Sequence, residues 1–372
     1  MAQAILCGFG SHLKIGEILA EAGSRRFMLV CDGSYPYLNI KEDIDKIDIP
    51  RVKFDGFSSN PQYNDVCRGV ELFRAESCDA IVAVGGGSSM DVAKCIKLFS
   101  RLDPSENYLT QEYKDSDVPL IAVPTTAGTG SESTRFAVIY FQGKKQSVAH
   151  GSIVPDHAIL DPGVLETLPL YQKKCTMLDA LCQGIESWWS VNSNEESRGY
   201  SRLAIEGIMR NMDAYIRDNS VSAAKEVMIA ANYSGRAINI TQTTAAHAMS
   251  YKLTSMYGLP HGHAVAVCLP EIWDYMIDHI GDCSDKRGEE HLGTVFRDIA
   301  DAMGYGTASE ASHAFRRILA ELEMRYPESE NKTADIEILT GSVNPVRLGN
   351  NPVPLGTDVL AALYGRIVGE KG

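Results

Sequence analysis

The segment CDAIVAVGGGSSMDVAKCIKLF, residues 78–99, determines the fold that the sequence predicts. A short apolar run leads into three glycines, Gly85, Gly86 and Gly87, and then into Ser88 and a helical pattern. Glycine lets a backbone approach a pyrophosphate closely, and a helix that begins just after it offers free N–H groups. The segment therefore indicates a phosphate-binding strand–turn–helix, with a plain tight turn as the alternative.

Two further apolar runs have the same character. They are RFMLVCD (26–32) and VPLIAVPTTAGTGSE (118–132), and each passes into a polar or Gly/Thr-rich turn. Continuous apolar strands separated by helical patterns are typical of a parallel sheet that is covered on both faces. The carboxyl ends of such strands can line one crevice, which is where open α/β sheets bind ligands.

The pattern changes after VPDHAILDPGVLETLPL, where Asp161-Pro162-Gly163 interrupts it and long helical patterns begin. We predict an α/β domain at residues 1–165 and a mostly helical domain at residues 166–372. In the first domain, Asp32 ends an early strand. An acidic residue there accepts from a ribose 2′-hydroxyl and repels a 2′-phosphate, which favours NAD over NADP. A turn or helix-cap aspartate is the alternative.

A second set of polar residues is typical of a metal site. Asp179 and Gln183 in LDALCQGIESWW are four residues apart, so they share one helix face. His247 and His261 follow, with a glycine and a proline between them that break the helix and allow His261 to turn back. A carboxylate plus two imidazoles is a standard ligand set for a catalytic divalent cation.

Composition excludes several classes. The formal net charge of −13 argues against a nucleic-acid surface, which needs a basic footprint. The nine cysteines include no CxxC pair, which is typical of reduced thiols in the cytoplasm. We see no signal peptide and no apolar run of membrane-spanning length. We therefore expect a soluble cytoplasmic protein with no membrane or nucleic-acid partner.

Six motifs together resemble one known family. They are GGGSSMDVAK, VPTTAGTGSESTRFAVI, DPGVLETLP, LDALCQGIES, HAMSYKL and GLPHGHAVAVCLP. In their order and spacing they are similar to the iron-dependent (group III) alcohol dehydrogenases, and the resemblance runs from near Gly8 to near Asn350. It implies an N-terminal dinucleotide-binding domain with a parallel sheet, an all-α metal- and substrate-binding domain, and a cleft between them.

The resemblance also implies cofactors, partners and site residues. The cofactors are NAD, with NADP as the alternative, and a divalent metal, Fe²⁺ or Zn²⁺; members form homodimers or larger oligomers. The implied cofactor-binding residues are Asp32, Gly85, Gly86, Gly87, Ser88, Asp91, Thr125, Thr126 and Thr129. The implied metal ligands are Asp179, His247 and His261, with Gln183 at a fourth position.

The sequence departs from the family at two positions. Gln183 stands where the metal helix usually has histidine, and Tyr251 stands where a further histidine is usual. An amide oxygen is a harder and weaker ligand than imidazole. Gln183 can therefore ligate weakly, leave a water in its place or hydrogen-bond the substrate. Tyr251 is a candidate acid–base group or, because its reference pKa is near 10, a packing residue.

The implied reaction is hydride transfer between the nicotinamide and the carbonyl carbon of a small aldehyde. Arg135, Lys252 and Arg347 are candidates for binding an anionic substrate or, alternatively, are solvated surface charges. The stretch DALCQGIESWWSVNS is most similar to the phosphonoacetaldehyde reductase subgroup, which forms 2-hydroxyethylphosphonate. A general short-chain alcohol dehydrogenase and a dehydroquinate-synthase-like lyase or cyclase are the alternatives.

Overall fold

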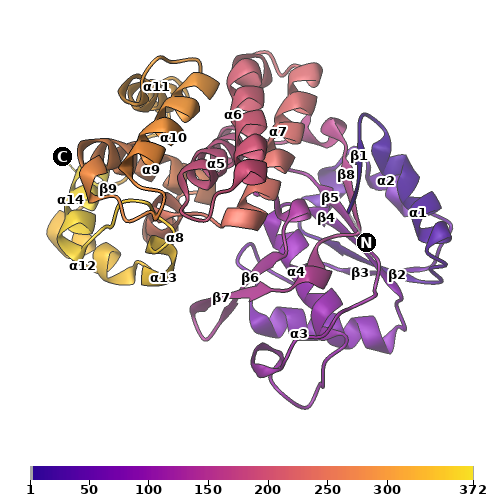
Figure 1. Cartoon of the computed structure of the whole chain (residues 1–372). Helices are drawn as coiled ribbons and strands as arrows, with labels where there is room; N and C mark the ends of the chain where they lie inside the picture. Colours follow the sequence, from indigo (N-terminus) through magenta and orange to yellow (C-terminus); the bar gives the residue numbers. More distant parts are fainter. Residues whose placement is uncertain (1–2, 372) are drawn as a thin grey trace. The chain divides into compact units, whose positions relative to one another are not determined.

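The computed structural model describes residues 3–371, which form two compact units (Figure 1). The N-terminal unit runs to Pro169 and also contains Arg217–Gly235. The helical unit contains Leu170–Ile216 and the chain from Arg236 onward.

The N-terminal unit is built on a six-stranded parallel sheet with the strand order β1-β8-β5-β4-β2-β3. Its strands are β1 (Ala4–Cys7), β2 (Phe27–Cys31), β3 (Arg51–Phe54), β4 (Ala80–Gly85), β5 (Leu120–Pro124) and β8 (His157–Leu160). Every residue of β2, β4 and β5 is buried. This explains why these strands are continuous apolar runs rather than alternating ones.

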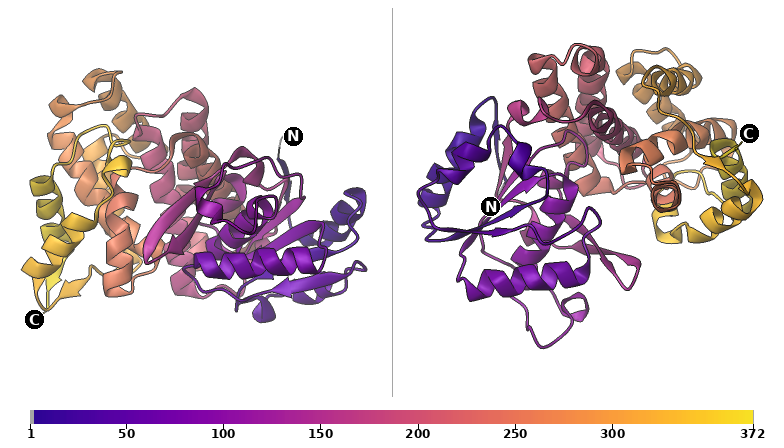
Figure 2. Two further views of the ribbon diagram at one scale, coloured as in Figure 1. Left: turned by 90° about the horizontal axis from the view of Figure 1, so that it is seen from below. Right: turned by 180° about the vertical axis from the view of Figure 1, so that it is seen from behind.

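Helices cover both faces of this sheet. They are α1 (Ile15–Glu21), α2 (Lys41–Asp45), α3 (Tyr63–Ala75) and α4 (Gly87–Phe99). The pair α3 and α4 lies on one face, and α1 and α2 lie on the other (Figure 1, Figure 2). An antiparallel hairpin of β6 (Phe136–Phe141) and β7 (Lys144–Ala149) packs against α4.

The helical unit confirms the predicted change of fold. Its helices are α5 (Leu170–Trp189), α6 (Glu195–Ile216), α8 (Ala245–Tyr257), α9 (His261–Asp278), α10 (Glu289–Ala302), α11 (Ala308–Glu321), α12 (Lys332–Ser342), α13 (Pro345–Leu348) and α14 (Thr357–Ile367). The end of α7 (Val221–Thr241) also belongs to it. The unit also contains a two-residue parallel pair, β9 (Glu328–Ser329) with β10 (Gly369–Glu370). The helical pattern of the sequence does not predict this pair.

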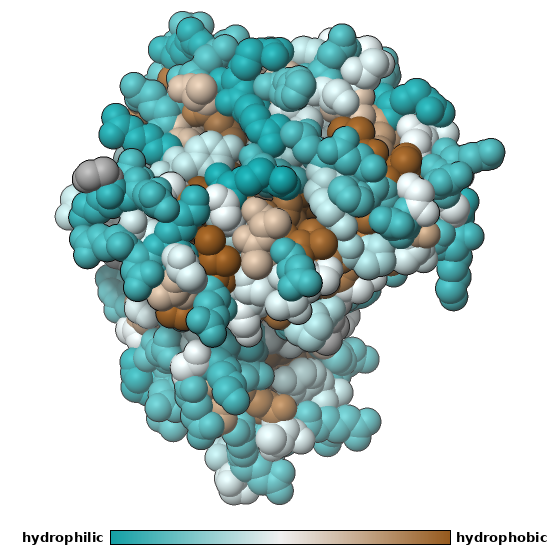
Figure 3. Space-filling view, turned by 90° about the vertical axis from the view of Figure 1, so that its left-hand side faces the viewer, coloured by the Kyte–Doolittle hydropathy of each residue, from teal (hydrophilic) through white to brown (hydrophobic). Residues whose placement is uncertain are grey.

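The core of the helical unit forms around α5, which packs against α6 and α9. Trp189 at the end of α5 meets Trp273 of α9 edge to face, with ring centroids 5.7 Å apart. The face shown in Figure 3 is mostly hydrophilic, and its hydrophobic residues form small separate patches. Across residues 3–371, none of the helices combines the length and the apolar character that a membrane span requires.

Candidate active site

The predicted cofactor loops lie at the carboxyl edge of three neighbouring strands. β4 ends at Gly85 and β5 at Pro124, and these two residues are paired in the register. The helix that follows β2 is α2, and the helix that follows β4 is α4. These two helices cover opposite faces of the sheet (Figure 2). Open α/β sheets bind ligands where the connections diverge in this way. Asp32, directly after β2, and Gly86, directly after β4, lie on the two sides of this point.

Glycine is required at this edge for close approach. Gly85 has φ +151°, and a Cβ there would lie 2.2 Å from Ser89 Oγ and 3.0 Å from a carboxylate oxygen of Asp32. A Cβ on Gly87 would lie 3.1 Å from the side chain of Thr129. Helix α4 begins here, and its first turn has no side-chain cap among the described residues. Its N–H groups and positive dipole end are therefore suited to a pyrophosphate.

Asp32 lies at the carboxyl edge, and its side chain also stabilises the turn that follows β2. Its Oδ1 accepts from Ser34 N (2.9 Å) and Ser34 Oγ (2.5 Å), and its Oδ2 accepts from Ser89 Oγ (3.2 Å). The side chain is only partly buried. The turn interpretation and the ribose-binding interpretation are thus compatible. Ser88, by contrast, donates its hydroxyl to the Ser59 carbonyl at 2.6 Å, which leaves its N–H for a phosphate.

The Thr-rich loop after β5 is fixed at both ends. The N–H of Thr125 donates to the last carbonyl of β4 at 3.0 Å. Gly130 has φ +61°, and a Cβ there would lie 2.4 Å from the Cα of Gly235 in α7. The loop thus packs backbone to backbone against α7. Thr126 and Thr129, between these two anchors, remain partly exposed.

Asp91 is directed at the protein's own backbone. Its carboxylate accepts from Ser131 Oγ and from the N–H of Val138, both at 2.9 Å. Burial raises the pKa of Asp91, and the nearby charge of Lys94 opposes that shift. The described contacts therefore tie α4 to the Thr-rich loop and to β6, and this anchoring supports the phosphate edge from behind.

Lys94, which the sequence analysis did not single out, completes this anchor. Its side chain is fully buried, and Nζ donates to Ser131 Oγ (2.9 Å), Thr134 Oγ1 (3.0 Å) and the carbonyl of Phe136 (2.8 Å). Burial lowers the pKa of Lys94 to about 8, although Asp91 and Glu132 act against the shift. At neutral pH it remains charged and satisfies three acceptors.

In the helical unit, three residues from three helices converge. Asp179 lies in α5, His247 in α8, and His261 is the first residue of α9. One ligand atom from each lies within 4.8 Å of the other two. Asp179 Oδ1 is 3.3 Å from His247 Nε2 and 4.0 Å from His261 Nε2. A carboxylate and two imidazole nitrogens at this spacing form a donor set that fits Fe²⁺ or Zn²⁺.

Local backbone geometry produces this convergence. Gly258 ends α8 in the left-handed conformation, with φ +68°, so the chain reverses before α9. Gly262 then allows α9 to approach α5 closely, because a Cβ there would lie 2.0 Å from the carbonyl oxygen of Cys175 and 2.8 Å from Asp179 Cβ. Any larger residue at position 262 would push His261 away from Asp179.

The buried polar atoms of this cluster fit a cation. Asp179 Oδ1 and His247 Nε2 are both inaccessible, and within residues 3–371 neither has a hydrogen-bond partner. Such atoms are costly without a ligand. Burial alone would raise the pKa of Asp179, but His247, His261 and a hydrogen bond from Gln183 lower it. The cluster therefore offers an ionised carboxylate beside two imidazoles.

Gln183 and Tyr251 flank the cluster. Gln183 lies one turn after Asp179 on α5, is 3% exposed and hydrogen-bonds the Asp179 carboxylate. This contact gives the amide a role next to the three ligand atoms. The ring of Tyr251 stacks on His261 with centroids 5.7 Å apart and an interplanar angle of 7°. Tyr251 thus supports the imidazole of His261 through its face.

Glu186 is a further residue that the sequence analysis missed. It lies seven residues after Asp179 on α5, hence on the same helix face. Its carboxylate is fully buried and contacts His247 Nδ1. Burial alone would lower the pKa of His247, but the carboxylates of Glu186 and Asp179 raise it to about 10. A cation held by His247 would therefore replace a proton on the imidazole.

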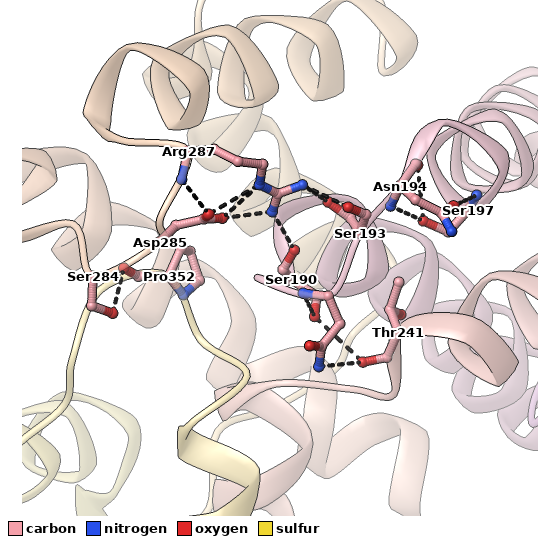
Figure 4. A network of polar contacts seen from close by, with 10 residues as sticks. Ser190, Ser193, Asn194, Ser197, Thr241, Ser284, Asp285, Arg287 and Pro352 are labelled. Atoms are coloured by element: carbon pink, nitrogen blue, oxygen red, sulfur yellow. Dashed lines mark hydrogen bonds and ion pairs between the residues drawn. The ribbon is translucent and has the colours of Figure 1, made fainter.

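The far end of α5 is fixed by a polar network around Arg287 (Figure 4). The guanidinium donates to the carbonyls of Ser190 (2.9 Å) and Ser193 (2.6 Å) and pairs with Asp285. A cation at the carboxyl end of a helix satisfies its last carbonyls and complements its dipole. The helix that carries Asp179 and Glu186 is thus held at its end.

The three candidate cations lie in different surroundings. Arg135 is exposed in the N-terminal unit, with its guanidinium over the ring of Phe136. Lys252 is half-buried on α8. Arg347 donates to Thr243 Oγ1 at 3.2 Å. Of these, Arg347 is attached to the segment that leads directly into the His247 helix.

Two family sequence models match the chain. The model described as "Iron-containing alcohol dehydrogenase" matches residues 2–162, and the one described as "Fe-containing alcohol dehydrogenase family, C-terminal" matches residues 174–367. The chain belongs to the iron-containing alcohol dehydrogenase family. Its members named below are alcohol dehydrogenases and aldehyde reductases, so this family member is an oxidoreductase.

Similar members of the iron-containing alcohol dehydrogenase family include the following bacterial proteins. Phosphonoacetaldehyde reductase of Streptomyces viridochromogenes is 33% identical over 80% of this chain and 77% of its own. The 1,3-propanediol dehydrogenase of Citrobacter freundii is 31% identical over 73% of this chain and 70% of its own. Sulfoacetaldehyde reductase of Bifidobacterium kashiwanohense, solved with NAD⁺, superposes with a TM-score of 0.87. It is 26% identical, with 98% of this chain and 96% of that chain covered.

Proposed function

We propose that this enzyme reduces a small anionic aldehyde, such as phosphonoacetaldehyde, to the primary alcohol with NADH. The observation that carries the proposal is the cluster of Asp179, His247 and His261, whose ligand atoms lie within 4.8 Å of one another. The carboxyl edge around Asp32 and Gly86 supports the choice of a dinucleotide. The proposed cofactor residues are those predicted from the sequence, with Asp91 acting through the loop that it anchors.

In this proposal Asp179, His247 and His261 hold Fe²⁺ or Zn²⁺. When bound there, such an ion supplies a Lewis acid for a carbonyl oxygen. Gln183, hydrogen-bonded to Asp179, orients that carboxylate. Tyr251 stacks on His261 and keeps its imidazole in place. The residues around the cluster thus fix the three donors before substrate arrives.

The anionic substrate is supported by two relatives and one contact. The Streptomyces relative is named for a phosphonate aldehyde, and the Bifidobacterium structure is named for a sulfonate aldehyde. Arg347 lies beside Thr243, four residues before His247. A planar guanidinium binds a tetrahedral oxyanion through two parallel hydrogen bonds. We propose that Arg347 binds the anionic group of the substrate.

NADH oxidation with a panel of short aldehydes tests this proposal. The panel contains phosphonoacetaldehyde, sulfoacetaldehyde, acetaldehyde and 3-hydroxypropanal, each with Fe²⁺, Zn²⁺ or no added metal. We expect the two anionic aldehydes to give the highest kcat/KM, and Arg347→Gln to lower that value for them alone. Equal or better rates with neutral aldehydes contradict the anionic pocket.

A general short-chain alcohol dehydrogenase is the second candidate, because the Citrobacter relative is named for 1,3-propanediol. It predicts that 3-hydroxypropanal and acetaldehyde react best and that Arg347→Gln changes nothing. Net NADH consumption in either case excludes a lyase or cyclase that regenerates its cofactor. A homodimer or larger oligomer in the cytoplasm stays a prediction.

A further inference from the structure

The segment before the His247 helix has an unusual backbone. Gln242 has φ +59°, and Thr244, the N-cap of α8, has φ −118° and ψ −138°. Non-glycine residues rarely adopt a positive φ, and they do so only where surrounding contacts hold them there. Something must therefore fix the turn from which His247 projects.

Glu186 holds the end of this segment, from Thr244 onward, with contacts from α5. Its Oε1 accepts from Thr244 Oγ1 (2.8 Å), Thr244 N (3.2 Å), Ala246 N (2.9 Å) and His247 N (3.3 Å). Three of these donors are N–H groups at the start of α8, so one carboxylate oxygen caps much of its first turn. Trp189, one turn further along α5, donates Nε1 to Thr244 Oγ1 at 2.9 Å.

The other oxygen of the same carboxylate controls the imidazole. Oε2 contacts Nδ1 of His247, and Nε2 of that ring faces Asp179 Oδ1 at 3.3 Å. A carboxylate only accepts, so it keeps a proton on Nδ1, and the proton that a cation can displace is the one on Nε2. Because Oε1 is already held by four donors, the carboxylate cannot rotate to release the ring.

We propose that Glu186 is the positioning residue of the metal site, which sets the orientation of His247 and holds a proton on its Nδ1 while it caps the first turn of α8. This inference rests on the proposed metal site of Asp179, His247 and His261. In this proposal Glu186 acts on the metal site through His247 and the start of α8.

The decisive variant is Glu186→Gln, which keeps the side-chain shape. The amide oxygen can still serve the four donors, and this orients the NH₂ group toward His247 Nδ1. An NH₂ group donates, so Nδ1 must now accept and the ring keeps its one proton on Nε2. A cation on Nε2 would then require a proton on Nδ1, where the carboxylate that accepted it is missing. We expect the affinity for Zn²⁺ to fall by about 10- to 100-fold, the range typical of lost outer partners.

Zn²⁺ affinity is measured by chelator competition. The Nδ1 proton of His247, which a contact with the Glu186 carboxylate should shift strongly downfield, is followed by ¹H–¹⁵N NMR of histidine-labelled protein. Thr244→Val is the matched control, because it removes one capping hydroxyl and leaves the carboxylate on His247. We expect Thr244→Val to lower Tm and to bind Zn²⁺ as the wild type does. Should Glu186→Gln not fold, Glu186→Asp is used, whose shorter carboxylate keeps the charge but retracts from the ring; we expect it also to weaken Zn²⁺ binding.

Two outcomes overturn the inference separately from the proposed function. A folded Glu186→Gln or Glu186→Asp protein with wild-type Zn²⁺ affinity refutes the role of Glu186 and leaves the metal site standing. A wild-type protein that takes up no Zn²⁺ refutes the metal site and the inference together. An unchanged Nδ1 proton signal of His247 in Glu186→Gln refutes the proposed route of the effect.

Discussion

At the carboxyl edge of the sheet, the groups that can meet a cofactor are mostly backbone N–H groups of Gly86, Gly87 and Ser88. In the helical unit, the groups that can meet a cation are three side chains, Asp179, His247 and His261. In each region a buried charged side chain supports the groups that can meet the cofactor or the cation. Lys94 stands behind the phosphate edge, and Glu186 stands behind the metal cluster.

The two buried charges act on different targets. Lys94 donates to two hydroxyls and one carbonyl, so it fixes the path of loops. Glu186 caps a helix and also contacts one imidazole nitrogen, so it fixes a chemical state as well as a position. A site made of backbone should lose function mainly through changes of loop geometry. A site made of side chains should lose function when a single donor atom is removed.

The largest expected effect is a loss of catalytic activity on replacing His261 but not its neighbour His263. His261→Ala removes one of the three proposed ligands and should lower kcat/KM for aldehyde reduction by about three orders of magnitude, on the order of 4 kcal/mol. Steady-state kinetics with added Zn²⁺ or Fe²⁺ measures this loss. If reduction continues at the wild-type rate, the metal assignment is wrong.

His263 is the matched control, two residues further along α9. Its Nδ1 bonds the Tyr171 hydroxyl at 2.8 Å and its Nε2 bonds the Arg325 carbonyl at 2.9 Å. His263→Ala should therefore lower Tm and leave kcat/KM of the folded protein close to wild type. Equal catalytic losses in the two variants would show that the helix, rather than one nitrogen atom, matters.

The next effect concerns Lys94 and depends on pH. Its pKa is lowered from 10.5 to about 8 in the folded chain by burial. Between those values the unfolded chain binds more protons than the native one, so this group makes stability rise with pH, by at most about 3 kcal/mol. Lys94→Met removes that rise. It also leaves three buried acceptors without their donor, which should cost about 3 kcal/mol or more at pH 7.

Urea unfolding of both proteins at pH 7, 8, 9 and 10, with thiols kept reduced, measures this difference. Cysteine and tyrosine residues away from position 94 ionise alike in both proteins, so the difference between their unfolding free energies reports the Lys94 replacement together with its effect on the carboxyl of Asp91. We expect the gap to widen from pH 8 to pH 10. A gap that does not change with pH means that Lys94 keeps an ordinary pKa in the folded protein.

The sequence predicts those features that depend on local pattern. The buried strands β2, β4 and β5 are continuous apolar runs, and the helical unit has long amphipathic patterns, so the fold class was predicted correctly. The family assignment, now confirmed, rests on six ordered motifs. Asp179 and the two histidines could also be singled out from the sequence, because carboxylate and imidazole side chains are common metal ligands.

What the sequence could not show depends on distant partners. Glu186 bonds backbone groups about sixty residues away, and nothing near it in the chain indicates that contact. Lys94 lies in a helix where a lysine usually faces solvent, yet its side chain is fully buried. The two-residue pair of β9 and β10 is too short to give any periodic signal.

The smallest expected effects come from replacing Gly85 or Gly86, two neighbouring glycines of the phosphate edge. A Cβ at Gly85 would meet Ser89 Oγ at 2.2 Å, and φ +151° is a conformation that only glycine adopts readily. Gly85→Ala should therefore lower the unfolding free energy by about 1–3 kcal/mol. At Gly86 the nearest atom, in Thr126, is 3.7 Å away, so Gly86→Ala should leave stability almost unchanged.

NADH affinity, measured by fluorescence titration, should differ between these two variants in the opposite sense from stability. The methyl group at position 86 projects where a pyrophosphate must approach the first turn of α4, so Gly86→Ala should weaken NADH binding by about tenfold, or 1.4 kcal/mol. Gly85→Ala acts on the protein first and on NADH only through the displaced Ser89. If Gly86→Ala binds NADH as the wild type does, the pyrophosphate does not lie on this turn, and the backbone-built site must be sought elsewhere along the same edge.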